Sequence, residues 1–262
     1  MVLYKIDELT PAQIAGICDH TFLDRPESYQ KAGQSATKLW EEGLGKFLQA
    51  IVDFSINDLQ PYAVCVRPEV VLTTREFLSN EGCNNITIAS VVGFPDGQLS
   101  ATALKVAETE FALDCGATEI GMVLKYNDLK SGMRKGKVIG DIDEVMRKAK
   151  EYDATVKLIL ENSELTPGQI KEACNLARIC QVPMIETSTG FGSYNARRED
   201  VIQMRRKFTG GIKVSQEVAR HNLYELLHAA SGRTDGQIEL DPHFVRIGEI
   251  SLLYDFYRES RR

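Results

Sequence analysis

The sequence predicts an α/β protein folded as one (β/α)8 barrel, and three observations support this. The chain has 262 residues, close to the roughly 250 that such a barrel uses as one domain. Short β-branched or apolar runs alternate with longer segments of helical periodicity along its length. No low-complexity tract or Pro/Gly/Ser-rich linker divides it, so residues 1–262 are expected to form a single domain.

Eight short apolar runs have the length and composition of buried strands. They are Ile17–Leu23, Tyr62–Val66, Ile86–Val92, Glu119–Leu124, Val156–Glu161, Pro183–Ser188, Gly211–Ser215 and Phe244–Ile247. Strands that alternate with helices form right-handed βαβ units and a parallel sheet. Eight such units in this length favour a closed barrel over an open sheet, and the GxGxxG pattern of dinucleotide-binding sheets is absent.

Segments between these runs have the spacing of amphipathic helices. Ala101–Cys115 and Asp141–Glu151 each gather apolar residues on one face, and Thr166 with Gln169 has the spacing of a capping box. These helices are expected to cover the outside of the barrel.

One segment is longer than a minimal barrel needs. Arg25–Asn57 contains helical patterns in Ser28–Glu42 and Lys46–Phe54, which predict an extra helical insertion between strands 1 and 2. Ser231–Pro242 is polar and predicts a loop or hairpin before the last strand.

The composition excludes several classes of protein. Hydrophobic residues make up 43% of the chain and the net charge is −6, so nonspecific nucleic-acid binding has no electrostatic support. No apolar run approaches the ~18 residues that span a bilayer, and the N-terminus lacks the apolar core of a secretory signal. The six cysteines form no CxxC pair, so we expect reduced thiols, no metal site and a cytoplasmic protein.

Two ionisable residues lie near the ends of the sixth and seventh predicted strands. Period two in a strand puts Glu186 on the face of Met184 and turns the apolar Ile212 and Val214 toward the helices. Lys213 then points into the barrel. A charged side chain there must be paired or functional, so we expect an ion pair between Glu186 and Lys213 on strands about 4.8 Å apart.

The strand ends and several segments between them resemble a known family, the 2-deoxyribose-5-phosphate aldolases. The matching motifs keep the family's order over most of the chain: Asp19–His20–Thr21, Val64–Cys65–Val66, Val91–Pro95, Lys105–Thr109, Gly116–Ala117, Glu119–Ile120, Leu129–Gly132, Thr187–Gly192 and Gly211–Lys213. The resemblance implies class I aldolase chemistry, which needs no metal and no cofactor. In it a lysine on strand six attacks the sugar carbonyl, a second lysine on strand seven lowers its pKa, and an aspartate on strand four relays protons.

The chain departs from the family at the residues that carry this chemistry. Glu186 stands where the resemblance places the Schiff-base lysine, and a carboxylate cannot form an imine. Gly121 stands where it places the aspartate, and glycine cannot carry a proton; the strand-seven lysine is present as Lys213. Cys65 takes a family site position but is expected to act as a small buried residue, whereas Asp19 is either a site residue or a structural one. The candidate catalytic residues are therefore Lys213, Glu186, Gly121, Cys65 and Asp19.

The resemblance also implies a phosphate site after strands seven and eight, where backbone N–H groups bind the anion. Gln216 and Glu217 replace two glycines of that site, and Gly248–Glu249–Ile250–Ser251 replaces a turn of small residues. Carboxylates beside a phosphate dianion are repulsive, so a small phosphorylated sugar is expected to bind poorly. The substrate and phosphate region comprises Thr187, Ser188, Thr189, Gly190, Gln216, Glu217, Gly248 and Ser251.

Two functional hypotheses follow. In the first, the protein lacks aldolase activity and has a binding or regulatory role with a protein partner. Fold-level analogy suggests an actin-like filament as that partner. A homodimer is a further possibility. In the second, it is an active carbon–carbon lyase or isomerase on a different carbonyl substrate, using Lys213, Lys125 or Glu186. Lys125 shares strand-four parity with Gly121, and Glu186 would act as a general base. Glu186 would also raise the pKa of Lys213 and suppress nucleophilic attack by it.

Overall fold

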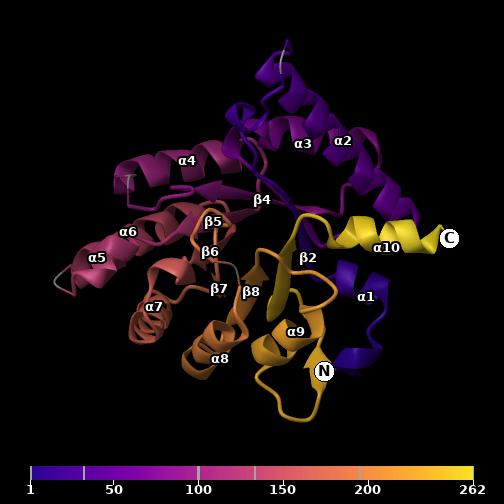
Figure 1. The fold of residues 1–262 in the computed structure, drawn as a ribbon. Helices are drawn as coiled ribbons and strands as arrows, with labels where there is room; N and C mark the ends of the chain where they lie inside the picture. Colours follow the sequence, from indigo (N-terminus) through magenta and orange to yellow (C-terminus); the bar gives the residue numbers. More distant parts are fainter. Residues whose placement is uncertain (1, 32, 99–100, 133, 195, 262) are drawn as a thin grey trace.

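The chain closes eight parallel strands into a barrel, as the sequence predicts. In the computed structural model, which describes residues 2–31, 33–98, 101–132, 134–194 and 196–261, the barrel order is β10-β2-β3-β4-β5-β6-β7-β8 (Figure 1). The barrel strands are β2 (Cys18–Phe22), β3 (Ala63–Val66), β4 (Thr87–Val92), β5 (Glu119–Val123), β6 (Thr155–Ile159), β7 (Met184–Glu186), β8 (Gly211–Ser215) and β10 (Val245–Glu249). Each overlaps one of the eight predicted runs, so the barrel prediction is confirmed.

Helices follow the strands and surround the barrel (Figure 1). They are α1 (Pro11–Ala15), α2 (Ala36–Ile56), α3 (Val71–Asn80), α4 (Thr102–Asp114), α5 (Tyr126–Lys130), α6 (Lys135–Lys150), α7 (Pro167–Ile179), α8 (Arg198–Lys207), α9 (Leu223–Ser231) and α10 (Leu252–Ser260). The predicted capping box is present at α7, where Thr166 accepts from the Gln169 backbone and Gln169 accepts from the Thr166 backbone. Among the described residues, no helix combines the length and apolar character needed to cross a membrane.

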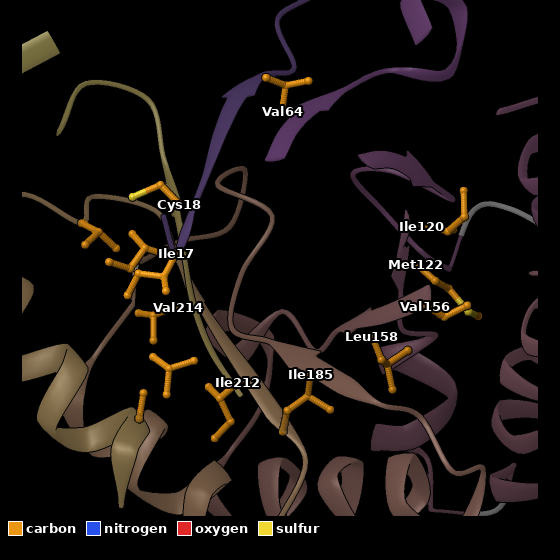
Figure 2. Packing of buried hydrophobic residues seen from close by; sticks show 14 of the residues in the cluster. Ile17, Cys18, Val64, Ile120, Met122, Val156, Leu158, Ile185, Ile212 and Val214 are labelled. Carbon is orange, nitrogen blue, oxygen red and sulfur yellow. The ribbon is translucent and has the colours of Figure 1, made fainter. Parts of the chain in front are cut away.

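The alternation along each strand separates an apolar outer face from an inner one. Figure 2 shows side chains of the apolar outer layer, which pack against the helices: Ile17, Cys18, Val64, Ile120, Met122, Val156, Leu158, Ile185, Ile212 and Val214. Each of them is almost completely buried. Burial of this layer fixes the register of every strand, because a slip of one residue would turn these side chains into the barrel interior.

The predicted insertion between the first two barrel strands consists of a 3₁₀ turn at Pro26–Ser28 and the 21-residue helix α2. The two helical stretches expected in Ser28–Glu42 and Lys46–Phe54 are one continuous helix that starts at Ala36. Its two glycines cost up to about 1 kcal/mol each relative to alanine, but Phe47 and Phe54 on its buried face pack against the barrel and outweigh this cost. In Figure 1, α2 lies beside α3 and near α10.

A small second sheet lies outside the barrel. β1 (Leu3–Lys5) pairs antiparallel with β9 (Gln237–Glu239), with Tyr4 opposite Ile238. The predicted loop or hairpin at Ser231–Pro242 therefore contains a strand whose partner is the N-terminal segment. This pairing ties the N-terminus to the segment that precedes β10.

Candidate functional site

A cavity of about 170 Å³ lies at the carboxyl ends of the barrel strands, where functional sites of such barrels are found. Its lining includes nine residues singled out from the sequence, namely Cys65, Glu186, Ser188, Thr189, Lys213, Gln216, Glu217, Gly248 and Ser251. The apolar part of its wall comes from Leu23, Val91, Phe94, Val218 and Ile250, among others. The cavity thus has a polar floor and a largely apolar wall.

The floor of the cavity contains the predicted Glu186–Lys213 ion pair. The two residues are aligned across β7 and β8, and Nζ of Lys213 lies 3.1 Å from Oε1 of Glu186. Ser215 donates its hydroxyl hydrogen bond to the same carboxylate oxygen over 2.5 Å. The other oxygen, Oε2, accepts no hydrogen bond from a described residue. The expectation that both charged side chains point into the barrel is confirmed.

Asp19 links this pair to a second set of buried charges that the sequence analysis did not identify. Its Oδ2 lies 2.9 Å from Nζ of Lys213 and 2.7 Å from Nζ of Lys157. Below it, Lys157 also pairs with Glu119 over 2.8 Å, and Arg246 pairs with both carboxylates. Asp19 is therefore a central member of the site, and its carboxylate faces three cations.

The electrostatics of the network keep Lys213 and Asp19 charged. Burial would lower the pKa of Lys213, but the carboxylates of Asp19 and Glu186 outweigh it and hold that pKa well above its ordinary value. Burial would likewise raise the pKa of Asp19, but Lys157, Lys213 and Arg246 hold it well below its ordinary value. At neutral pH, Lys213 is an ammonium ion and not a free amine.

Cys65 lies in the cavity wall, and its pKa is raised to about 11, mainly because it is buried. It is a protonated thiol at neutral pH, as the expectation of a small buried residue requires. Gly121 lies on the inner wall of β5, where an added Cβ would be 3.5 Å from side-chain carbons of Ile159 and Val91. A Cβ therefore fits at position 121 without a clash.

Lys125 is not part of the cavity, which corrects the expectation that it shares the orientation of Gly121. β5 ends at Val123, so the strand alternation does not extend to residue 125. The ammonium group of Lys125 lies 3.0 Å from Asp141 and 3.1 Å from Thr102 Oγ1. These contacts direct Lys125 toward α4 and α6.

The loop after β7 includes a buried hydroxyl, that of Ser188, for which no described residue supplies a hydrogen-bond partner. Thr187 donates to the Ser215 carbonyl and accepts from the Ser215 backbone, and Thr189 binds Glu161 through its backbone N–H and its hydroxyl. Ser188 lines the cavity and is 2% exposed, but its hydroxyl has no hydrogen-bond partner among the described residues. A buried hydroxyl without a partner is costly, and a ligand oxygen in the cavity would remove this cost.

The loop after β8 keeps a backbone shape that normally requires glycine. Gln216 and Glu217 have φ angles of 78° and 50°, in the left-handed region that favours glycine. Gln216 packs its side-chain amide over Gly190 and donates to the Thr189 carbonyl over 3.1 Å. A Cβ at Gly190 would lie 2.0 Å from that amide nitrogen, so these two positions constrain each other.

The last residue of β10, Glu249, has a carboxylate that is already bound. Glu249 Oε1 lies 2.6 Å from His20 Nδ1, and Oε2 accepts from the backbone N–H of Leu253 in the first turn of α10 over 3.3 Å. His20 faces outward from β2 and stacks on Phe47 of α2, with ring centroids 4.9 Å apart. Of the two carboxylates expected beside a phosphate, only Glu217 is exposed at the rim; Glu249 is buried. Ser251 is exposed at the N-terminus of α10.

A second hollow of about 290 Å³ adjoins the cavity at its rim. The two spaces share Thr21, Leu23, Thr189, Gln216 and Ile250 in their linings. Phe191 and Ile250 flank the outer hollow, and the side chain of each is 58% exposed. The ring of Phe191 also meets Phe94 of the inner wall edge-on, with centroids 5.4 Å apart.

No group of three or more histidine, cysteine, aspartate or glutamate residues that could hold a metal ion is present in the described part of the chain. The polar groups among the cavity's described lining residues are carboxylates, hydroxyls, the Gln216 amide, the Cys65 thiol and the Lys213 ammonium group.

The fold and the site define the class of protein: a (β/α)8 barrel with a buried lysine–carboxylate network at the carboxyl ends of its strands. The sequence is similar to the deoxyribose-phosphate aldolase of Thermococcus gammatolerans, with 40% identity over 164 residues that cover 60% of this chain and 72% of the relative. It is also similar to the deoxyribose-phosphate aldolase of Carboxydothermus hydrogenoformans, with 33% identity over 215 residues that cover 78% and 85% of the two chains.

The chain belongs to the deoxyribose-phosphate aldolase family. The solved structure of the deoxyribose phosphate aldolase from Aeropyrum pernix has the same fold, with a TM-score of 0.72, 19% identity and coverage of 98% of this chain and 95% of that one. No family model matches the chain.

Proposed function

We propose that this member of the family does not cleave 2-deoxyribose 5-phosphate, and that it binds a small carbonyl- or hydroxyl-bearing ligand in the barrel mouth without forming an imine. The observation that carries the proposal is the state of Lys213. Its ammonium group lies between the carboxylates of Asp19 and Glu186, at 2.9 and 3.1 Å. Imine formation needs the unprotonated amine, and both carboxylates stabilise the protonated form.

Two neighbouring positions support the same conclusion. Glu186 stands where the family resemblance places the Schiff-base lysine, so this position offers a carboxylate and no amine. Gly121 offers no side chain to relay a proton. Two neighbouring lysines, as the family resemblance implies, repel each other, and this repulsion lowers the pKa of a lysine. In this chain Glu186 attracts Lys213 instead, and the attraction raises the pKa of Lys213.

Phosphate is also disfavoured at the mouth. Barrels of this type often bind phosphate with the loops after strands seven and eight and the N-terminus of the following helix. Here the Glu249 carboxylate accepts the Leu253 backbone N–H at the start of α10, and Gln216 and Glu217 carry side chains where backbone N–H groups would approach the anion. The protein thus supplies its own anion at this helix terminus.

Borohydride trapping together with a cleavage assay tests the proposal. We expect neither imine-linked mass nor cleavage when the protein is incubated with 2-deoxyribose 5-phosphate and borohydride. The Glu186→Lys, Gly121→Asp variant restores both catalytic residue types, and the Glu41→Gln variant, altered on the exposed face of α2, is the control with the same change in net charge. Parent turnover within the ordinary enzymatic range of ~1–10³ s⁻¹, or trapping on Lys213, would overturn the proposal.

A second candidate function is enolisation of a carbonyl compound, which the geometry of Glu186 favours. Its Oε2 has no hydrogen-bond donor among the described residues, while Lys213 lies beside Oε1. Glu186 would take a proton from the carbon next to the carbonyl; the C–H electron pair would form the new C=C bond, and the π pair of the carbonyl would move to its oxygen, where the Lys213 ammonium would stabilise the enolate. Deuterium exchange into hydroxyacetone in D₂O, followed by NMR, tests this step. Loss of exchange in Glu186→Gln supports it, and exchange that is equal in the two proteins contradicts it.

The expectation of a regulatory role with a protein partner stays a prediction. Co-sedimentation with filamentous actin tests the actin-like partner, and light scattering of the purified chain tests the homodimer.

A further inference from the structure

The cavity and the adjoining rim hollow form one cleft with two chemically different ends. The inner end presents Lys213 Nζ and the partnerless hydroxyl of Ser188, which is buried and lines the cavity. Both groups donate hydrogen bonds to an oxygen atom. The outer end presents the exposed apolar side chains of Phe191 and Ile250. A ligand that fills the cleft therefore needs an oxygen at one end and an apolar group at the other.

The charges around the cleft exclude an anionic ligand. Glu186, Glu217 and Glu249 line the inner cavity and Asp24 lines the outer hollow, against the single ammonium group of Lys213. The same carboxylates do not form a site for a cation. Glu186 is paired with Lys213, Glu249 is bound by His20, and Asp24 accepts from the Tyr29 hydroxyl over 3.1 Å. The fourth carboxylate, Glu217, is exposed to solvent at the rim. The charge pattern thus fits an uncharged ligand.

We propose that the cleft binds a neutral ketone or aldehyde that carries an aryl or alkyl substituent. Its carbonyl oxygen lies at Lys213 and Ser188, and its substituent lies between Phe191 and Ile250. This inference rests on the proposed function in one respect only, namely that the ligand occupies this cavity. It adds the chemical class of the ligand and two residues, Phe191 and Ile250, that determine specificity.

The size of the two spaces agrees with this assignment. The inner space of about 170 Å³ is small for a complete ligand, whereas ligand pockets usually measure roughly 300–1,000 Å³. The outer hollow, which shares five lining residues with the inner space, adds about 290 Å³. A side chain such as Ile250, exposed over more than half of its surface, would gain stabilisation when a substituent of the ligand covers it.

NMR titration of the full-length protein with three probes tests the proposal. The probes are 4-phenylbutan-2-one, which has the carbonyl and the aryl substituent; acetone, which lacks the substituent; and 2-deoxyribose 5-phosphate, which is anionic. We expect the aryl ketone to bind at least about tenfold more tightly than the other two. Equal or tighter binding of the phosphorylated sugar would overturn the assignment of an uncharged ligand.

Variants at the two ends locate the ligand. Ile250→Ser should weaken binding of the aryl ketone about five- to tenfold, whereas Ile179→Ser, altered at a position of equal 58% exposure on α7 outside both spaces, should leave it unchanged. Ser188→Ala should weaken binding of both ketones about two- to tenfold. Identical affinities in Ile250→Ser and Ile179→Ser would refute the inference. Because imine trapping and cleavage are measured separately, that result would leave the proposed function standing.

Discussion

The buried pair of Glu186 and Lys213 makes a prediction about stability that can be worked out from the structure. We expect Glu186→Ala to destabilise the protein, because it leaves the Lys213 ammonium with one carboxylate partner in place of two. Both side chains are almost completely enclosed, with 7% of the Glu186 side chain and 3% of the Lys213 side chain exposed. Because so little of either side chain meets solvent, water compensates only partly for the missing carboxylate.

The magnitude follows from the distances. Unit charges 3.1 Å apart attract by about 5 kcal/mol at an effective dielectric constant of about 20. Breaking a buried pair on one side costs about 3–5 kcal/mol when no other partner remains. Lys213 keeps Asp19 at 2.9 Å, and the variant no longer has to bury the Glu186 carboxylate. We therefore expect a loss of about 2–3 kcal/mol in the free energy of unfolding.

Urea denaturation of four variants, namely Glu41→Ala, Glu186→Ala, Lys213→Met and the Glu186→Ala, Lys213→Met double variant, measures this effect. Glu41→Ala, on the exposed face of α2, is the control and should change stability by less than about 0.5 kcal/mol. Glu186→Ala combined with Lys213→Met should be more stable than the sum of the two single changes predicts, by about 1–3 kcal/mol. Additive effects, or a Glu186→Ala variant as stable as the control, would show that the ion pair does not hold this part of the barrel together.

Three further expectations concern single groups. The carboxylates of Asp19 and Glu186 outweigh burial and raise the pKa of Lys213. The charged Lys213 therefore contributes its full stabilisation below the unfolded lysine pKa of about 10.4, and this contribution is lost as the pH rises through the higher pKa of the folded state. The free-energy difference between the parent and Lys213→Met should therefore be constant from about pH 6 to about pH 9 and shrink only above about pH 10.5; a decrease within the neutral range would contradict this. Cys65, with its pKa raised to about 11 by burial, should resist iodoacetamide in the native protein at pH values near 8 and react once urea unfolds it, as mass spectrometry of the peptides would reveal. The Glu217→Gly variant should be at least as stable as the parent in urea. Glycine adopts the positive φ of this position without the cost of about 1–2 kcal/mol that other residues bear. Clear destabilisation would show that the Glu217 side chain itself is needed.

The sequence was sufficient for those features that depend on local periodicity. The alternation in the sixth and seventh predicted strands placed Glu186 and Lys213 inside the barrel, and the structure confirms this orientation. The same alternation puts Lys157 inside, next to outward-facing Val156 and Leu158, so a signal for this second buried lysine was present in the sequence. The parity argument was wrong for Lys125, because it extended a strand beyond its last residue.

The partners within the network could not be predicted, because they depend on how the barrel closes. Arg246 and Asp19 are separated by 227 positions in the sequence, and they meet only because β10 pairs with β2. The contact between His20 and Glu249 spans 229 positions and depends on the same pairing. Local patterns determine which face a side chain takes, but the closure of the sheet determines what it meets there.

The position of Glu249 also limits how this protein can change in evolution. Its carboxylate holds the first turn of α10 and the ring of His20, and that ring is stacked on α2. A substitution that emptied this helix terminus for an external anion would leave His20 without any hydrogen-bond partner, since its Nε2 already has none among the described residues. A variant in which the N-terminus of α10 is free to bind an external anion would therefore need compensating changes in α2, on which His20 stacks. Through Glu249, substitutions at the barrel mouth and substitutions in α2 depend on each other.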